Sequence, residues 1–250
     1  MTDFHIHSNY SFDSDEKLSN IVTHSIKKGL ATITITDHFE FKDGVLTISK
    51  DNLLRRQDEI ETLKHKYSSQ IKILTGLEIG FVKEKADQLA KAIAPLRLDY
   101  VINSVHEVKG YDCYDERYYI GKDKHTAYLD YFNAVLHSLD APYPYNTIGH
   151  LGYVSRMAPY TDTAIYYNDF KDILDKILTT IIKKEKALEL NSNAKSSTMP
   201  HIPNLEILTA YKNLNGKKVA FGSDAHCVER IGEWISEVKV VADKMGFSLK

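Results

Sequence analysis

Short apolar runs rich in β-branched residues alternate along this chain with longer segments in which apolar residues recur at helical spacing. Such alternation is typical of a β/α architecture built on a parallel sheet. Strands are predicted at seven places, namely Asp3–His7, Thr32–Thr36, Ile71–Ile79, Tyr100–Val105, Thr147–Gly149, Ala187–Asn191 and Lys218–Ser223. Helices are predicted at Leu18–Lys28, Leu53–Lys66, Lys85–Leu96, Lys124–Leu139, Asn168–Lys186, Pro203–Leu214 and Val228–Met245.

The repetition of these units favours one closed α/β barrel of the TIM type with one unit fewer than eight, extending over residues 1–250. An open, doubly wound sheet is the alternative. That fold commonly carries a Gly-x-Gly-x-x-Gly turn after its first strand, and this chain has none there. Glycine and proline are scattered rather than gathered into a linker, so we expect a single domain.

Composition narrows the class of protein. The apolar fraction of 43% and the charged fraction of 26% are those of an ordinary soluble protein. A formal net charge of −2 gives no basic excess for holding a nucleic-acid backbone. Cys113 and Cys227 form no Cys-x-x-Cys pair, and no apolar stretch approaches the roughly 20 residues that a membrane span needs. We therefore expect a reduced, cytoplasmic protein with neither nucleic acid nor membrane as a partner; its oligomeric state is left open.

Histidines and carboxylates recur where the predicted strands end. They are His5 and His7, Asp37 and His38, Glu78, His106, His150, and Asp224 with His226. Barrel enzymes build their active sites at the carboxyl ends of the strands, so these side chains are expected to converge. Any one of the histidines alone is better explained as a hydrogen-bonded structural residue. Together they indicate a metal centre.

Two further observations support this interpretation. The remaining histidines provide an internal control, because they fall on predicted helices or in a proline-flanked loop: His24, His65, His125, His137 and His201. Neighbouring cations also need bridging anions, since divalent ions about 4 Å apart repel one another. Glu78 is the best candidate for a bridge, although alone it would be interpreted as a salt-bridged residue at a strand end.

The complete set of motifs resembles the polymerase and histidinol phosphatase (PHP) superfamily of metal-dependent phosphoesterases. The matching motifs occur in family order over nearly the whole chain: His5-Ile6-His7-Ser8, Thr36-Asp37-His38, Glu78, Ser104-Val105-His106, Gly149-His150 and Ser223-Asp224-Ala225-His226. The resemblance implies a distorted seven-stranded (β/α)7 TIM-like barrel. It also implies three divalent metal ions, and mixed imidazole and carboxylate ligation accepts zinc, iron or manganese.

The resemblance implies a distribution of ligands among these ions. The first would be held by His5, His7, Glu78 and Asp224, the second by Glu78, His106 and His150, and the third by His38, His226 and one residue from the loop after His7. Some relatives use a histidine in that loop, where this chain offers Asp13. We expect Asp13 there, with Asp15 as the second choice. Asp37 is expected either to orient an imidazole ligand or to cap a loop.

Within the superfamily, the resemblance is closest to the histidinol-phosphate phosphatase family, on the stretch from His5 to Ser14 and on Glu189-Leu190-Asn191. It implies hydrolysis of L-histidinol phosphate to L-histidinol and inorganic phosphate in histidine biosynthesis, by a metal-bridging hydroxide that attacks phosphorus. Asp224 and His226 are the candidates for proton transfer to the leaving alkoxide. Three cations, three carboxylates and the hydroxide leave a formal charge of roughly +2, which suits a phosphate dianion.

Loop residues are expected to bind this small phosphomonoester substrate and to determine its specificity. Arg117, Arg156 and Lys195 are candidates for binding phosphate, and Glu107 for binding the substrate ammonium. The loop Tyr111–Tyr119 offers aromatic faces for an imidazole ring. Alternatively, each charged residue is a solvated charge on the surface, and the loop is a solvated lid. Cys227 is expected to be a packed thiol.

Two rival functions remain open. One is another enzyme of the superfamily, such as a phosphodiesterase, a nuclease or a protein tyrosine phosphatase. The other is a non-catalytic binding module that retains the barrel. The complete set of candidate ligands argues against the binding module, because binding alone would not need all of these side chains.

Overall fold

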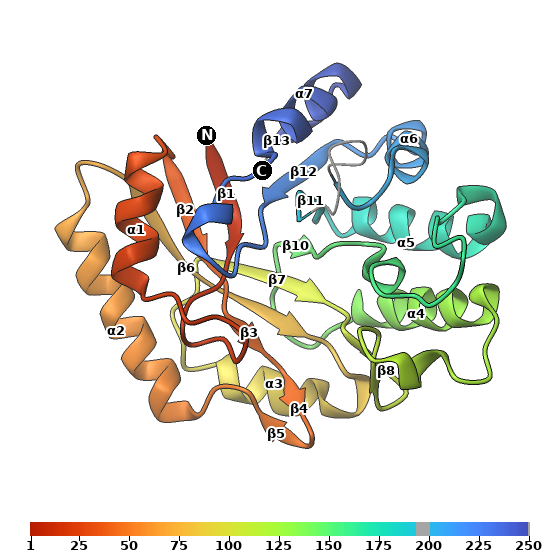
Figure 1. The fold of residues 1–250 in the computed structure, drawn as a ribbon, viewed down its shortest axis with the longest axis horizontal. Helices are drawn as coiled ribbons and strands as arrows, with labels where there is room; N and C mark the ends of the chain where they lie inside the picture. The colour runs from red at the N-terminus through yellow and green to blue at the C-terminus, as the bar shows by residue number, and fades with distance from the viewer. Residues whose placement is uncertain (194–200, 250) are drawn as a thin grey trace.

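A curled parallel sheet forms the centre of the molecule in the computed structural model, which describes residues 1–193 and 201–249 (Figure 1). Its strands follow the order β1 (Thr2–Ile6), β2 (Thr32–Ile35), β6 (Lys72–Gly80), β7 (Tyr100–Ser104), β10 (Thr147–Ile148), β11 (Ala187–Asn191), β12 (Lys218–Gly222) and β13 (Ser248–Leu249). A further two-residue strand, β3 (His38–Phe39), pairs with β6. Every predicted strand is present, and the α/β class is confirmed. The count of seven is not, because β3 and β13 also pair with the sheet.

Strands β1 and β12, from opposite ends of the sequence, meet at their carboxyl ends. Ile6 and Ala225 form a parallel bridge, and the Asp224 amide donates to the His5 carbonyl at 2.8 Å. At its beginning, β12 instead pairs with β13, through Lys218 and Ser248. The sheet therefore curls as a distorted TIM-like barrel would, and it brings both ends of the sequence to one place.

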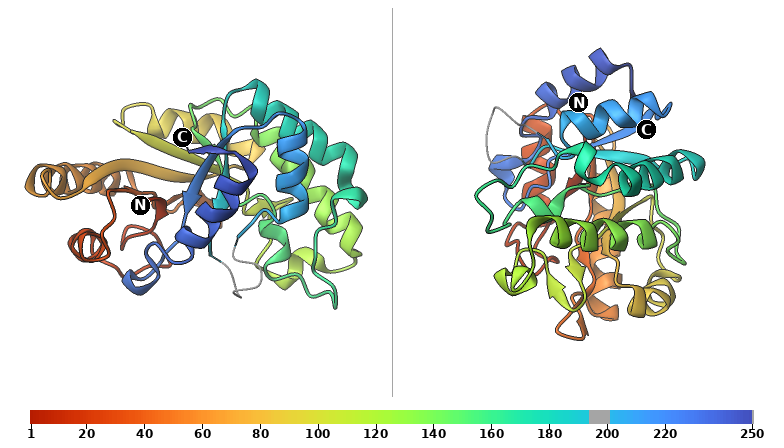
Figure 2. Two further views of the ribbon diagram at one scale, coloured as in Figure 1. Left: turned by 90° about the horizontal axis from the view of Figure 1, so that it is seen from above. Right: turned by 90° about the vertical axis from the view of Figure 1, so that its right-hand side faces the viewer.

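Helices cover the outside of the sheet (Figures 1 and 2). They are α1 (Leu18–Lys27), α2 (Lys50–Lys66), α3 (Ala86–Ile93), α4 (Lys124–Ser138), α5 (Lys171–Lys183), α6 (Leu205–Asn213) and α7 (Ile235–Met245). One apolar cluster, including Ile21, Ile33 and Ile60, joins α1 and α2 to the first strands. A larger one, including Leu174 and Leu188, lies beneath the helices of the second half. Among the described helices, none is long and apolar enough to cross a membrane.

Several predicted helices are shorter than expected, and two of them begin with a 3-10 turn instead of α-helix. The segment predicted to begin at Asn168 starts with a 3-10 turn, η4 (Tyr167–Phe170), before α5. The segment predicted from Val228 is divided into a 3-10 turn, η5 (Val228–Arg230), and α7. Gly232 and Trp234 between them have φ angles of 71° and 57°. Left-handed backbone cannot continue a right-handed helix, so the apolar periodicity there overestimated the helix.

Two β-hairpins project from the strand ends and were not predicted. The first is β4 (Phe41–Lys42) with β5 (Val45–Leu46), and the second is β8 (Glu107–Val108) with β9 (Tyr111–Asp112). Their two-residue turns, Asp43-Gly44 and Lys109-Gly110, have positive φ at both positions. Such turns match the twist of paired strands. The remaining 3-10 turns are η1 (Lys83–Lys85), η2 (Glu116–Tyr119) and η3 (Tyr153–Ser155).

A buried ion pair ties α2 to the sheet just behind the strand ends. The Arg56 guanidinium contacts the Asp37 carboxylate and also donates to the carbonyls of Ile35 at 2.9 Å and Gly76 at 2.8 Å. Both charged side chains are almost fully buried. Burial raises the pKa of Asp37, but the guanidinium outweighs it and holds that pKa below its usual value. The pair therefore fixes α2 against β2 and β6.

Asp37→Asn is expected to lower the free energy of unfolding by about 3–5 kcal/mol, because it leaves a buried guanidinium without its counter-charge. The stabilisation by ionised Asp37 should be fully present above about pH 4, the ordinary pKa region of Asp. It should be lost as the pH falls through the depressed pKa of Asp37 in the folded state. Urea unfolding at several pH values measures this change in the free energy of unfolding. The exposed Arg55 on the same helix provides the control, because Arg55→Ala should change stability by less than about 0.5 kcal/mol. An Asp37→Asn protein as stable as the parent would contradict the expectation.

Candidate metal centre

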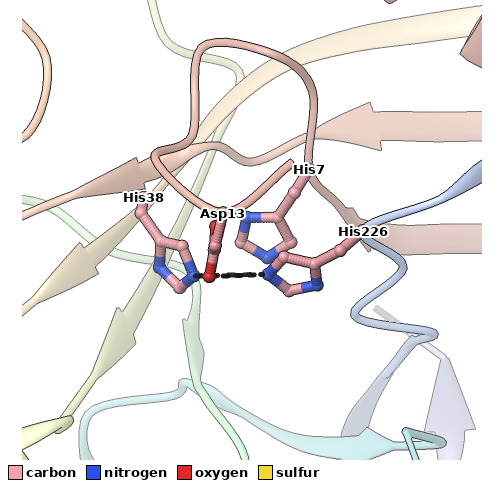
Figure 3. A group of neighbouring side chains, drawn as sticks. All are labelled: His7, Asp13, His38 and His226. Atoms are coloured by element: carbon pink, nitrogen blue, oxygen red, sulfur yellow. Dashed lines mark hydrogen bonds and ion pairs between the residues drawn. The ribbon is translucent and has the colours of Figure 1, made fainter. Parts of the chain in front are cut away.

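All nine residues predicted as metal ligands lie together at the carboxyl end of the sheet. His7, Asp13, His38 and His226 form one group whose ligand atoms are within 4.8 Å of one another, and Figure 3 shows their side chains pointing toward a common point. Three further groups meet the same distance limit: His5, His7 and Asp224; Glu78, His106 and His150; and His38, Glu40 and His106. Because His7, His38 and His106 each belong to two groups, the groups are continuous.

Glu78, near the end of β6, lies in the middle of the cluster. Its Oε2 is 3.2 Å from His5 Nε2 and 2.9 Å from His38 Nδ1. Its Oε1 is 2.9 Å from His150 Nε2 and 3.2 Å from His106 Nε2. Burial raises the pKa of Glu78, but His5, His106 and His38 together hold it well below the usual range. An ionised carboxylate with one oxygen toward each side of the cluster has the geometry of a bridge.

Outer partners fix the orientation of four imidazoles through their Nδ1 atoms. Nδ1 of His5 lies 2.6 Å from Glu189 Oε1, and Nδ1 of His106 lies 2.8 Å from Glu40 Oε2. Nδ1 of His226 is 2.9 Å from the Asp224 carbonyl, and Nδ1 of His7 is 3.0 Å from Ser11 Oγ. A ring that donates its Nδ1 hydrogen outward keeps a lone pair on Nε2, which is the atom directed to the centre.

These inward lone pairs fit divalent cations. Nε2 of His106 and Nε2 of His150 are 3.3 Å apart, and Nε2 of His38 and Nε2 of His226 are 3.5 Å apart. His5 Nε2, His7 Nε2 and Glu78 Oε2 are buried, and their mutual contacts lack hydrogen-bond geometry. In the neutral rings that bind a metal, facing lone pairs repel, and a buried polar atom without a hydrogen bond costs about 1–3 kcal/mol. A metal ion between such atoms removes both penalties, and imidazole nitrogen with carboxylate oxygen is a donor set that zinc accepts.

The protonation of the imidazoles follows from their surroundings. Burial, with His226 and His38 nearby, lowers the pKa of His7 to about 3, and burial also lowers the pKa of His150. Burial acts in the same direction on His5, His38 and His106, but neighbouring carboxylates, Glu78 foremost for His5 and His38 and Glu40 for His106, outweigh it and hold their pKa well above the usual value. Those three rings would release protons on binding a cation, so metal affinity should fall as the pH falls.

The loop after β1 supplies Asp13 to the cluster. Asp13 Oδ2 lies 3.4 Å from His38 Nε2 and 3.3 Å from His226 Nε2, and the dashed lines in Figure 3 mark these contacts. Asp15, the second choice, is exposed and belongs to none of the four groups. Of the two candidates, the structure brings only Asp13 to the histidines.

Asp37 performs both of the roles considered for it. Its Oδ1 accepts hydrogen bonds from the Ser8 backbone amide and from Ser11 Oγ, which in turn contacts His7 Nδ1. Its Oδ2 contacts Arg56. Asp37 therefore shapes the loop after β1 and orients His7 through Ser11.

Two carboxylates beside the ligands were not predicted as site residues. Glu40 contacts His106 and follows His38 by two residues, so strand periodicity is the signal that could have identified it. Glu189 lies on β11 and contacts His5 through Oε1, while its Oε2 accepts from the His150 amide at 2.6 Å. Glu189 stands in a stretch that carries the family resemblance, but the sequence did not show which ligands it contacts.

The predicted substrate residues lie in different places. Arg156 is beside the cluster, with Nη1 3.1 Å from Asp224 Oδ2 and Nη2 donating to Asn191 Oδ1 at 2.8 Å. Arg117 is exposed and paired with Asp115. Glu107 is half-buried on the β8–β9 hairpin. Lys195 lies outside the described residues, so its predicted contact with phosphate stays a prediction.

A cavity of about 340 Å³ opens next to His106, between the two hairpins. Its lining is formed by Glu40, Phe41, Lys42, Asp43, His106, Glu107, Gly110, Tyr111, Asp112, Tyr114, Asp115 and Arg117. Carboxylates outnumber cations in this lining, and we refer to it as the acidic cavity. Burial and the negative charges of Glu40 and Asp112 raise the pKa of Glu107. The acidic cavity therefore favours a positively charged occupant.

Comparisons with known proteins agree with this geometry. A sequence model of the PHP domain matches residues 3–193. A histidinol-phosphatase of Lactococcus lactis is 34% identical over 248 residues, which cover 98% of this chain and 91% of the relative. A probable histidinol-phosphatase of Clostridium acetobutylicum is 30% identical, covering 92% of this chain and 88% of the relative. The crystal structure of histidinol phosphate phosphatase from Lactococcus lactis, complexed with zinc, L-histidinol and phosphate, matches with a TM-score of 0.87 at 32% identity, over 99% of this chain and 94% of that one. The similarity therefore includes both sequence and fold over nearly the entire chain.

Proposed function

The chain belongs to the PHP domain family, and from this membership we propose that the clustered histidines and carboxylates are the active centre of a histidinol-phosphatase. The enzyme is a metal-dependent phosphoric monoester hydrolase that converts L-histidinol phosphate to L-histidinol and inorganic phosphate, a reaction of histidine biosynthesis. The observation that carries the proposal is the match, over almost both complete chains, to a phosphatase structure holding zinc, L-histidinol and phosphate.

The cluster would hold three divalent ions. His5, His7, Glu78 and Asp224 suit one ion, Glu78, His106 and His150 the second, and His38, His226 and Asp13 the third; the groups found within 4.8 Å support this division. Zinc is bound in the Lactococcus lactis structure, and iron and manganese accept the same donors. Such ions supply Lewis acidity, which attracts phosphate oxygens and makes water acidic enough to act as a nucleophile near neutral pH.

The protein's own residues position the phosphate and move the proton. Arg156 is held by Asp224 and Asn191 at the edge of the cluster, where its guanidinium can bind a phosphate oxygen. Asp224 is only 5% exposed and is already held by Arg156, whereas the His226 side chain is 28% exposed. His226 is therefore the better placed of the two to reach the leaving alkoxide. It could give a proton only if its Nε2 were protonated and free of the third ion, because its Nδ1 is engaged with the Asp224 carbonyl.

The charge balance supports an anionic substrate after a correction. Glu40 and Glu189 contact ligand histidines and add two negative charges that the estimate from sequence omitted, while Arg156 adds one positive charge. With three divalent cations, the formal charge of the site is therefore one unit lower than the value from sequence, and it is still positive. A phosphate dianion remains favourable in this field.

The acidic cavity is the proposed site for the amino-alcohol part of the substrate. It adjoins His106, and Glu107 with Asp112 can pair with an ammonium group. Tyr153 lies with its ring centroid 4.9 Å from that of His106, and Tyr114 lies 5.0 Å from Tyr153. These rings extend an aromatic surface from the metal ligands toward the cavity, which suits an imidazole ring.

Glu107→Gln is expected to raise KM for L-histidinol phosphate by about 10-fold or more, because a charge-assisted hydrogen bond is worth about 1.5–3 kcal/mol. Hydrolysis of phenyl phosphate, which has no ammonium group, should be unaffected. Steady-state kinetics with both substrates measures the difference. Glu116→Gln is the matched control, since Glu116 is exposed on the neighbouring loop and does not line the acidic cavity. Equal effects on the two substrates would show that Glu107 does not bind the ammonium group of the substrate.

We also propose that residues 1–250 form one domain whose barrel is built by the seven strands predicted from the sequence. The pairing of β13 supports this, because among the described strands it pairs with β12 alone, and only at the beginning of that strand. β3 has two residues and continues the path of β2 beside β6.

A substrate panel tests the proposed function. Zinc-loaded protein is given L-histidinol phosphate, a phosphotyrosine peptide and a dinucleotide at equal concentration, and phosphate or nucleotide release is measured. We expect the highest kcat/KM for L-histidinol phosphate. If the peptide or the dinucleotide were hydrolysed with equal or higher kcat/KM, the chain would be a tyrosine phosphatase or a phosphodiesterase of the same family.

A further inference from the structure

Three glycines at strand ends are not explained by backbone conformation. Seven of the chain's glycines have the positive φ angles that disfavour side chains, but Gly80, Gly149 and Gly222 lie outside that region. Gly80 and Gly222 are the last residues of β6 and β12, and Gly149 directly follows β10. Their backbone would accept any residue, so another factor must exclude a side chain here.

The factor is the lack of room for a Cβ atom at each of the three positions. A Cβ atom on Gly80 would come closer than 3.0 Å to Glu40 Oε2, and also to Glu40 Cβ, at 2.7 Å. A Cβ atom on Gly149 would come within the same limit of Ser104 Oγ. One on Gly222 would come within that limit of Glu189 Oε1 and also of the Cβ of His5, at 2.5 Å. Real Cβ atoms essentially never approach other heavy atoms so closely. Each glycine therefore leaves room for one particular oxygen.

The same three oxygens contact the proposed metal ligands. Glu40 Oε2 is 2.8 Å from Nδ1 of His106. Ser104 Oγ donates to Oε1 of Glu78 at 2.7 Å. Glu189 Oε1 is 2.6 Å from Nδ1 of His5. In all three cases a Cβ would displace the oxygen that orients the ligand, and at Gly222 it would also press on the ligand His5 itself.

We propose that Gly80, Gly149 and Gly222 are positioning residues of the metal centre, each required for the space that its ligand-orienting oxygen occupies. The inference rests on the proposed metal-dependent function and deepens it. Outer partners of this kind typically contribute 10- to 100-fold to metal affinity. A single methyl group added at position 80 or 149 should therefore weaken metal binding without contact with any ligand side chain.

The first test is Gly80→Ala. We expect its affinity for zinc to fall by about 10- to 100-fold in competition with a chromophoric chelator, because Glu40 can no longer orient His106. Gly216→Ala is the matched control: its Cβ would also come closer than 3.0 Å to neighbours, the Tyr211 ring atoms, but on the loop between α6 and β12. It should lose thermal stability in the metal-free form while keeping zinc affinity. Equal zinc affinities in the two variants would overturn the inference.

A double-mutant cycle separates displacement of the oxygen from general crowding. In a Ser104→Ala protein, the nearest atom left beside a Cβ at position 149 would be Ile102 Cγ2, at 3.0 Å, a distance to which a side chain can adjust. Gly149→Ala should therefore reduce zinc affinity in the parent and have little further effect in Ser104→Ala. Additive losses would mean that Gly149 acts independently of Ser104, which would overturn the proposal for this glycine.

The parent protein distinguishes failure of this inference from failure of the proposed function. If the parent bound no divalent cation at micromolar concentration, the proposed metal-dependent function itself would be wrong. If the parent bound zinc tightly and Gly80→Ala and Gly149→Ala bound it equally well, only the positioning role of the glycines would be refuted.

Discussion

Glu78→Gln is expected to remove nearly all hydrolysis of L-histidinol phosphate. Both oxygens of this fully buried carboxylate face imidazole nitrogens, at 2.9 Å for His38 and His150 and 3.2 Å for His5 and His106. An amide keeps the shape but loses the negative charge that separates neighbouring cations. Two charge-assisted interactions at about 1.5–3 kcal/mol each correspond to a loss of about 10²- to 10⁴-fold in kcat.

Metal content and kinetics on the same preparations measure this effect. Glu78→Gln should contain fewer divalent ions per chain than the parent as well as having the lower kcat. Glu237→Gln on the exposed face of α7 provides the control and should match the parent in both. A Glu78→Gln protein with full metal content and full activity would exclude the bridging role.

Removal of metal by a chelator is expected to abolish hydrolysis completely and to lower thermal stability. Without cations, buried atoms such as His5 Nε2, His7 Nε2 and Glu78 Oε2 make no hydrogen bond. An ion present at 100 times its dissociation constant stabilises the folded protein by about 2.7 kcal/mol, so the loss of several ions should lower Tm by many degrees.

The measurement is activity and Tm before chelation, after chelation and dialysis, and after zinc is returned. We expect both quantities to fall together and to recover together. Activity that persists in protein shown by elemental analysis to be metal-free would contradict metal dependence.

The strands and most of the cluster were predictable because their signals are local. Runs of β-branched residues identified the seven strands, and chemistry at their carboxyl ends identified eight of the side chains that the structure brings together. Asp13, the ninth, was predicted only through the family resemblance. His5 and His7 share a face because strand side chains alternate. Asp224 and His226 lie beyond the end of β12, where Asp224 has a φ of 53°, so alternation found them without describing their backbone. No contact between distant elements had to be known to recognise them.

What the sequence did not predict depends on contacts between distant segments. Glu40 follows β3, a strand of only two residues, so its spacing of two from His38 is a weak signal, and its role is established by its contact with His106. The acidic cavity lies between two short hairpins that are far apart in the sequence, residues 41–46 and 107–112. The role of Gly149 depends on where Ser104 lies, which only the folded sheet determines.

Anomalous diffraction from crystals of the zinc-loaded protein with phosphate tests the central claim most directly. We expect three zinc peaks, each within about 2.0–2.2 Å of imidazole nitrogens or carboxylate oxygens. The peaks should lie at His5, His7 and Asp224, at His106 and His150, and at Asp13, His38 and His226, with Glu78 between the first two. Zinc bound elsewhere on an active protein, with these nine side chains free of metal, would contradict the account.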